Sequence, residues 1–386
     1  MFARPWVVPA IAATLLCACS DDTVATDQRP VALDRGVDAP NAGRDQSHDA
    51  APCLGYTEDV TSCTPAATDY QPRKLAPGSN GWPTCISDDN TWHLSGTSQP
   101  SSIARSKAFE AMAAKLWKKT GAPSKDDFLS ARDDYSLAEG LASRVARRQD
   151  ISYPEVPGSD KFACQSAGIP EQYPDRCAGP AKIKPLVDDA FQKGNAGTQP
   201  LVQAARIEAG LLWFFHLSLA SEVWTCGFSN LGDCDSAAAY YTQVTARDAP
   251  AGLGRYVAAL GPETHQRIYD ALLAERCWRD IDKAMPAQDQ FRKYYDLAQA
   301  QLSKASLRGQ ALILRDRIGK IGCTVGETQQ AHLEFVRVLG GFLDHAAGLI
   351  DAAKAAELRT FTSNPKTSAS AIAAAQAALD AIFTCP

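Results

Sequence analysis

The sequence lacks the short motifs that mark several large enzyme classes. Its 386 residues contain no GxSxG or HExxH pattern, which would indicate a serine hydrolase or a zinc peptidase. They also contain no P-loop and no GxGxxG pattern, so nothing in them predicts nucleotide binding. These absences leave room for an enzyme whose catalytic residues come together from distant parts of the chain.

Charge and cysteine spacing argue against two further classes of protein, those that bind nucleic acid and those with a metal–thiolate site. The formal net charge is −5 and no long basic run occurs, which argues against nucleic acid as a partner. No CxxC pair is present, so the spacing typical of zinc ribbons is missing and a metal–thiolate site is not predicted.

Alternation of apolar and polar residues, the pattern of half-buried strands, is almost missing, whereas helical spacing of apolar residues is common. We therefore predict an all-α fold, a helical bundle with a disulfide-stapled, loop-rich N-terminal region. The expected helices end at proline and glycine breaks and span 103–120, 124–145, 183–194, 199–225, 235–247, 263–284, 288–320, 326–358 and 367–383. Within 326–358, the pair Gly340-Gly341 predicts a kink or a close helix crossing.

The predicted helix 199–225 is the most unusual of the expected helices. Its centre, AGLLWFFHLSLA, is apolar on almost every side, which is typical of a helix at the middle of a bundle. Only thirteen uncharged residues separate Glu208 from Glu222, too few to cross a bilayer. We therefore expect a buried central helix whose charged side chains are paired.

The first twenty residues have the layout of an export signal. Arg4 precedes an apolar run from Val7 to Leu16, and Leu16-Cys17-Ala18-Cys19 follows. This order resembles the lipobox of bacterial lipoproteins. Cys19 fits the lipidated position because small Ala18 precedes it, whereas bulky Leu16 precedes Cys17. The resemblance implies a cleaved signal peptide over 1–18 and attachment to the membrane through diacylglyceryl and fatty acyl groups on Cys19.

Composition divides the remainder of the chain. Residues 19–52 are rich in Asp, Ala, Pro and Gly and hold no aromatic residue, so we predict a disordered tether. Residues 53–100 are predicted to form an irregular, cysteine-containing cap, and 101–386 the helical bundle domain. Ser20 directly after Cys19 resembles outer-membrane sorting in enterobacteria, and the leaflet stays open.

Ten cysteines follow the lipobox, an even number that predicts disulfides in an oxidising compartment. Two local pairs are expected, because each brackets a short loop: Cys164 with Cys177 and Cys226 with Cys234. The partners of the other six cysteines cannot be deduced from spacing.

The candidate metal ligands are His216, Glu222 and Glu208, which lie on the predicted central helix. The alternative for His216 is a core histidine that bonds to a neighbouring helix. His332 and His345 are about 20 Å apart along one helix, at 1.5 Å per residue, and cannot share one ion. Each of these two is predicted to be a core or solvated residue.

An exported, lipidated and largely helical chain resembles the imelysin-like proteins of bacterial envelopes. The segments CDSAAAYYTQV, GLGRYVAAL and LLAERCW also resemble secreted helical lipoproteins of myxobacteria. The imelysin resemblance implies iron or haem as the bound group. Its GxHxxE metal motif does not occur here, because no histidine has glutamate three residues later.

We expect a non-enzymatic envelope lipoprotein that binds a small ligand or an envelope protein through its bundle. One alternative is an imelysin-like protein related to iron or haem. A second alternative is a hydrolase with a site assembled from distant helices.

Overall fold

The computed structural model describes residues 53, 56–58, 60, 63–78, 81–137, 140–157, 163–228, 230–284 and 289–386. The predicted signal peptide, the lipobox Cys19 and the predicted tether lie outside these residues. Asp49–Pro386 forms one compact unit.

Helices make up the regular structure of the described residues, which contain no strand, so the predicted all-α class is confirmed. Short 3₁₀ or π turns occur at Ile86–Asp89, Ala163–Gln165 and Gly179–Ile183. The α-helices are α1 Ser102–Lys115, α2 Lys125–Ser136, α3 Leu141–Val145, α4 Ile169–Gln172, α5 Lys184–Asn195, α6 Pro200–Phe228, α7 Leu231–Thr242, α8 Gly252–Leu260, α9 Pro262–Ala284, α10 Asp289–Ile321, α11 Gly326–Ile350, α12 Ala352–Ser363 and α13 Ala369–Ile382.

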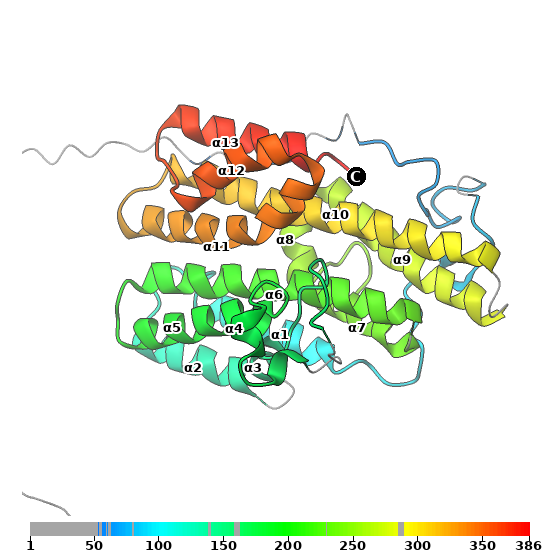
Figure 1. Cartoon of the computed structure of the whole chain (residues 1–386), viewed down its shortest axis with the longest axis horizontal. Coiled ribbons are helices and arrows are strands. Elements are labelled where there is room, and N and C mark those ends of the chain that lie inside the picture. The colour runs from blue at the N-terminus through cyan, green and yellow to red at the C-terminus, as the bar shows by residue number, and fades with distance from the viewer. Residues whose placement is uncertain are drawn as a thin grey trace, which may run out of the picture. The chain divides into compact units, whose positions relative to one another are not determined.

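Helix α6 is the central helix, as its sequence predicts. It packs against α5, α7 and α11 and also contacts α9 and α10 (Figure 1). Leu211, Leu212, Phe214 and Phe215 are fully buried, because neighbours cover every side of this apolar segment. No helix among the described residues is both long enough and apolar enough to span a membrane.

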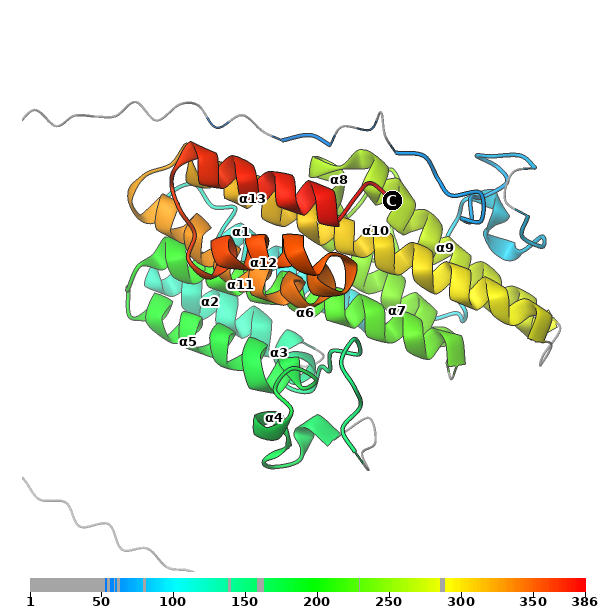
Figure 2. The same cartoon turned by 45° about the horizontal axis from the view of Figure 1, so that its top comes forward.

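The helices form two groups that meet at the α6–α11 contact (Figure 1). One group holds α1, α2, α5 and α7 beside α6, and the other holds α10, α12 and α13 beside α11. The segment that contains α4 projects from the bundle (Figure 2).

Several predicted helix boundaries are confirmed, and capping explains one of them. Ser124 begins α2 with a capping box: its hydroxyl accepts from the Asp127 amide, and the Asp127 carboxylate accepts from the Ser124 amide at 2.7 Å. The predicted continuous stretch 124–145 is wrong in one respect, because α2 ends at Ser136 and α3 begins at Leu141. Helix α8 was not predicted, since Pro250 and three nearby glycines suggested a break.

The predicted single helix 326–358 is also wrong. Asp351 adopts extended backbone, and its carboxylate accepts from the amides of Ala353 and Lys354, which ends α11 and begins α12. The helix α11 runs through Gly340-Gly341. A Cβ atom at Gly340 would lie 2.4 Å from the Thr362 side chain on α12, so this glycine allows the close crossing.

Five disulfides occur among the described residues. The two predicted local pairs, Cys164–Cys177 and Cys226–Cys234, are confirmed. The other three join the first part of the described chain to later parts: Cys85–Cys277 reaches α9, Cys53–Cys323 reaches the turn after α10, and Cys63–Cys385 reaches the C-terminal segment after α13. The region predicted as a cap is therefore held at three separate points, rather than stapled within itself.

One buried carboxyl group, that of Glu275, has no hydrogen bond to offset its loss of hydration. Glu275 on α9 is 1 % exposed, and neither carboxyl oxygen has a hydrogen-bond partner. Burial raises the pKa of Glu275 well above 4.5, because the charged form cannot be solvated there.

We expect Glu275→Gln to stabilise the protein relative to the wild type as the pH rises above 4.5. The folded state holds the Glu275 proton more tightly than the unfolded state, so its contribution is complete below pH 4.5 and is lost as pH rises through the folded pKa. In that interval, the free energy of unfolding of the variant should rise relative to that of the wild type by up to about 1.4 kcal/mol per pH unit. Urea unfolding from pH 5 to 8, with exposed Glu171→Gln as control, measures this; a difference that does not change with pH would contradict it.

Candidate functional site

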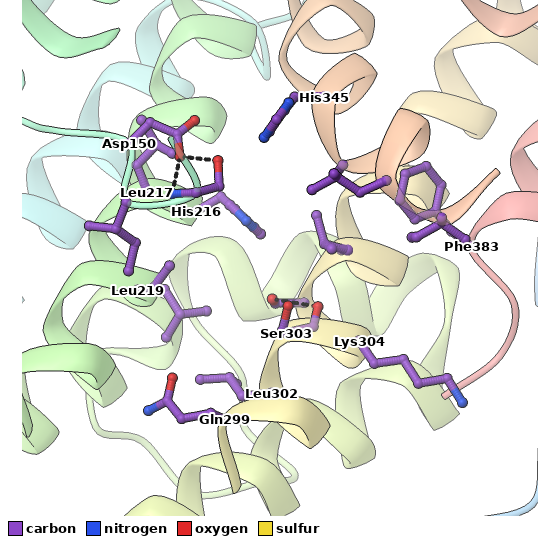
Figure 3. A pocket seen from close by; sticks show the side chains of 18 of the residues that line it. Asp150, His216, Leu217, Leu219, Gln299, Leu302, Ser303, Lys304, His345 and Phe383 are labelled. Atoms are coloured by element: carbon purple, nitrogen blue, oxygen red, sulfur yellow. Dashed lines mark hydrogen bonds between the residues drawn. The ribbon is translucent and has the colours of Figure 1, made fainter. Parts of the chain in front are cut away.

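A cavity of about 690 Å³ lies between the two groups of helices (Figure 3). Helix α6 contributes one wall, α10 a second and α11 a third. Two irregular segments complete the lining, the loop 150–152 and the C-terminal residues 382–384. The cavity therefore depends on five parts of the chain that are far apart in sequence.

His216 on α6 faces this cavity (Figure 3). Its ring centroid lies 4.9 Å from that of Phe342 on α11, and its Nδ1 has no hydrogen-bond partner. Burial lowers the pKa of His216 to about 4, so the imidazole is neutral at pH 7. The side chain therefore adds a neutral polar group to an apolar wall.

A second histidine, His345 on α11, lines the same cavity (Figure 3). Its ring stacks on Tyr153 with 4.1 Å between centroids and 20° between planes. Its buried Nε2 has no hydrogen-bond partner. Burial raises the pKa of Tyr153 to about 12, so this phenol stays protonated at neutral pH.

The loop that carries Tyr153 is held by Arg176. Its Nη1 donates to the carbonyl oxygens of Asp150 at 3.2 Å and Tyr153 at 2.8 Å, while the Asp150 amide donates to the Arg176 carbonyl. The next residue, Cys177, is bonded to Cys164. Together these contacts fix the part of the loop that lines the cavity.

The C-terminal wall is held by Arg308 on α10. Its Nη1 donates to the Phe383 carbonyl at 2.7 Å and to Asp380 at 3.1 Å. The disulfide Cys63–Cys385 fixes the chain two residues beyond Phe383. The C-terminal wall is thus tied to α10, and the loop 150–153 is tied to the turn that contains Arg176, in both cases by hydrogen bonds from a charged guanidinium.

The structure does not bring the three predicted metal ligands together. Glu208 accepts from Arg317 at 2.6 Å and from the Tyr256 hydroxyl at 3.0 Å. Glu222 pairs with Arg148 at 3.2 Å, and only His216 lines the cavity. Eight residues of helix separate Glu208 from His216, about 12 Å at 1.5 Å per residue, so the two cannot share an ion. The expectation that these buried carboxylates are paired is confirmed.

One group of potential metal ligands occurs among the described residues, and it comprises Glu58, Cys63 and Cys385. Its two sulfur atoms are bonded to each other, so they are not thiolate ligands. His265 has a structural role: its Nε2 donates to the Arg247 carbonyl and its Nδ1 accepts from the Tyr241 hydroxyl, both at 2.8 Å.

No local pattern in the sequence predicted His345 as a site residue. It lies on a different helix from His216, and only the α6–α11 packing brings the two histidines to one cavity. The position of residues 150–153 beside α11 follows from Arg176 and the Cys164–Cys177 bond, which depend on parts of the chain that are distant in sequence.

Comparisons with known proteins give this site no precedent. No family model, curated protein or solved structure matches this chain. The chemistry of the cavity is therefore argued from its own residues.

We expect His216→Gln to flatten the pH dependence of stability below pH 6.5. The pKa of His216 falls from 6.5 to about 4 on folding, so the stability contributed by the neutral ring is complete above pH 6.5 and is lost as pH falls toward 4. Between pH 7 and 4 the wild type should lose roughly 3 kcal/mol more than the variant. Urea unfolding measures this difference; equal losses would show that the His216 pKa is ordinary.

Proposed function

We propose that this chain is a non-enzymatic lipoprotein of the bacterial envelope whose helical bundle binds a small ligand. The observation that carries the proposal is the cavity beside α6, whose volume of about 690 Å³ falls within the range of small-molecule sites, about 300 to 1,000 Å³. Most of its lining residues are apolar, and a few polar side chains stand among them.

Two features support the envelope as the location. The lipobox-like order Leu16-Cys17-Ala18-Cys19 supports export and lipidation at Cys19, and Ser20 supports the outer membrane. All ten cysteines from Cys53 onward are paired in disulfides. Such pairing is typical of oxidising compartments.

The geometry suits binding because the walls are fixed before a ligand arrives. Helices α6, α10 and α11 are parts of the core, and Arg176 and Arg308 hold the two irregular segments. In a preformed site, little of the binding free energy is lost to the ordering of protein segments.

A cavity-filling substitution tests the proposal. Ala346 on α11 lines the cavity, so Ala346→Trp should place an indole there and exclude other molecules. We expect N-phenyl-1-naphthylamine, a neutral apolar reporter, to bind the full chain carrying Cys19→Ser and to bind the Ala346→Trp form at least about tenfold more weakly, equivalent to roughly 1.4 kcal/mol.

The control is Ala374→Trp, an exposed position on α13 outside the cavity, which should leave reporter binding unchanged. Circular dichroism confirms that each variant is folded. A folded wild type that does not bind the reporter, or an Ala346→Trp variant that binds it equally well, would overturn the proposal.

The anchor has its own prediction. In a bacterial host, Cys19→Ser should move the protein from the membrane fraction to the aqueous fraction and abolish metabolic labelling with an alkynyl fatty acid, because several acyl chains are needed for lasting attachment. Cys17→Ser should leave both unchanged. Labelling that persists in Cys19→Ser would place the acyl groups elsewhere.

Haem is a second candidate ligand, favoured by one observation. His216 and His345 come from different helices to the same apolar cavity, and each has a ring nitrogen without a hydrogen-bond partner. Either imidazole could hold haem iron as an axial ligand. Titration with haemin should then give a Soret shift that is lost in His216→Ala or His345→Ala. A haemin spectrum that does not change when the protein is added would exclude haem as the ligand and favour a ligand without iron.

A further inference from the structure

The walls of the cavity are aliphatic along most of its extent. On α6 they include Leu217, Leu219 and Val223, and on α10 they include Leu302 and Leu307. Among all the lining residues, the only ones with phenyl rings are Phe342 and Phe383. Branched aliphatic walls match flexible hydrocarbon, because the two pack without directional contacts.

The apolar lining continues to the protein surface. Leu349 and Ile350, the last two residues of α11, line the cavity and are 74 % and 53 % exposed. They belong to the small set of large apolar side chains that the described residues expose. Exposed apolar residues at the mouth of an apolar cavity indicate that the ligand passes over an apolar surface as it enters, which favours an apolar ligand.

Positive charge is confined to the edge of the cavity. Lys304 is the only lysine or arginine in the lining; its side chain is exposed and extends away from the two histidines (Figure 3). It forms no ion pair within the part of the chain that the structure describes. The one carboxylate in the lining, Asp150, already accepts from the amide and hydroxyl of Ser152. Deeper in, His216 is neutral at pH 7.

We propose that the ligand is an amphiphile with one long acyl chain and an acidic head group, the chain inside the cavity and the head beside Lys304. This inference rests on the proposed function and names the ligand class for the same site. The methylene groups gain about 0.8 kcal/mol each on leaving water, which supplies the affinity. The head stays at the mouth, because a charged group inside would lose its hydration without a partner.

Two sources could supply such a molecule. A free fatty acid carries a carboxylate, and a lysophospholipid such as lysophosphatidylglycerol carries a phosphate diester on the same kind of chain. Both present one acyl chain and one negative charge, and the test separates them.

The experiment measures displacement of N-phenyl-1-naphthylamine from the full chain carrying Cys19→Ser, which removes the protein's own acyl groups as competitors. Oleate and lysophosphatidylglycerol are the two acidic competitors, and zwitterionic lysophosphatidylcholine is the matched comparison. All are used below their critical micelle concentrations. We expect at least one acidic amphiphile to displace the reporter at a concentration at least about threefold lower than lysophosphatidylcholine, as one partly exposed ion pair allows.

Charge reversal supplies the control. Lys304→Glu should weaken the acidic competitor by about threefold to tenfold relative to lysophosphatidylcholine, each measured against the reporter affinity of the same variant, and exposed Lys107→Glu should not change this ratio. Displacement by oleate alone assigns the ligand to free fatty acids, and displacement by lysophosphatidylglycerol alone assigns it to membrane lipid. Reporter binding that no amphiphile displaces, or that acidic and zwitterionic lipids displace equally, overturns this inference and leaves the proposed function standing. A protein that does not bind the reporter at all overturns both.

Discussion

The ion pair between Arg308 and Glu58 joins four segments that are far apart in the sequence. The Glu58 side chain is fully buried and accepts from Arg308 at 2.9 Å, from the Thr264 hydroxyl at 2.7 Å and from the Thr264 amide. Arg308 also binds Asp380 and the Phe383 carbonyl. One guanidinium thus joins the N-terminal segment, the start of α9, the middle of α10 and the C-terminus. Removing Arg308 would leave the buried Glu58 carboxylate without its ion-pair partner, a change that typically costs about 3 to 5 kcal/mol.

The Arg308–Glu58 pair also links the stability of the fold to the position of one wall of the cavity. Phe383 is a wall residue, and its backbone is held by Arg308 and by the neighbouring Cys63–Cys385 bond. On the opposite side Arg176 holds Tyr153 against His345 in the same manner. Both irregular walls of the cavity are therefore held by hydrogen bonds from charged guanidinium groups.

Local chemistry was predictable from the sequence, and long-range assembly was not. The apolar centre of α6, the start of a helix at Ser124 and the bond between Cys226 and Cys234 each depend on residues close in sequence, and all three were predicted. The break at Asp351 was missed because an aspartate can cap a helix or lie exposed on one, and helical spacing continues on both sides of it. Two features depend on how α6, α10 and α11 pack, which no local pattern encodes. They are the disulfide partners of Cys53, Cys63 and Cys85, and the cavity that His216 and His345 share.

The order of the disulfides has a consequence for biogenesis. Cys53, Cys63 and Cys85 are synthesised first, but their partners lie 270, 322 and 192 residues later. If cysteines paired in the order in which they are made, Cys53 would join Cys63, and Cys85 would capture Cys164. Three of the five native bonds can form only after most of the chain has been completed. Its maturation should therefore require reshuffling of early mispaired bonds, and yield in a heterologous host should depend on a disulfide isomerase more than on an oxidase.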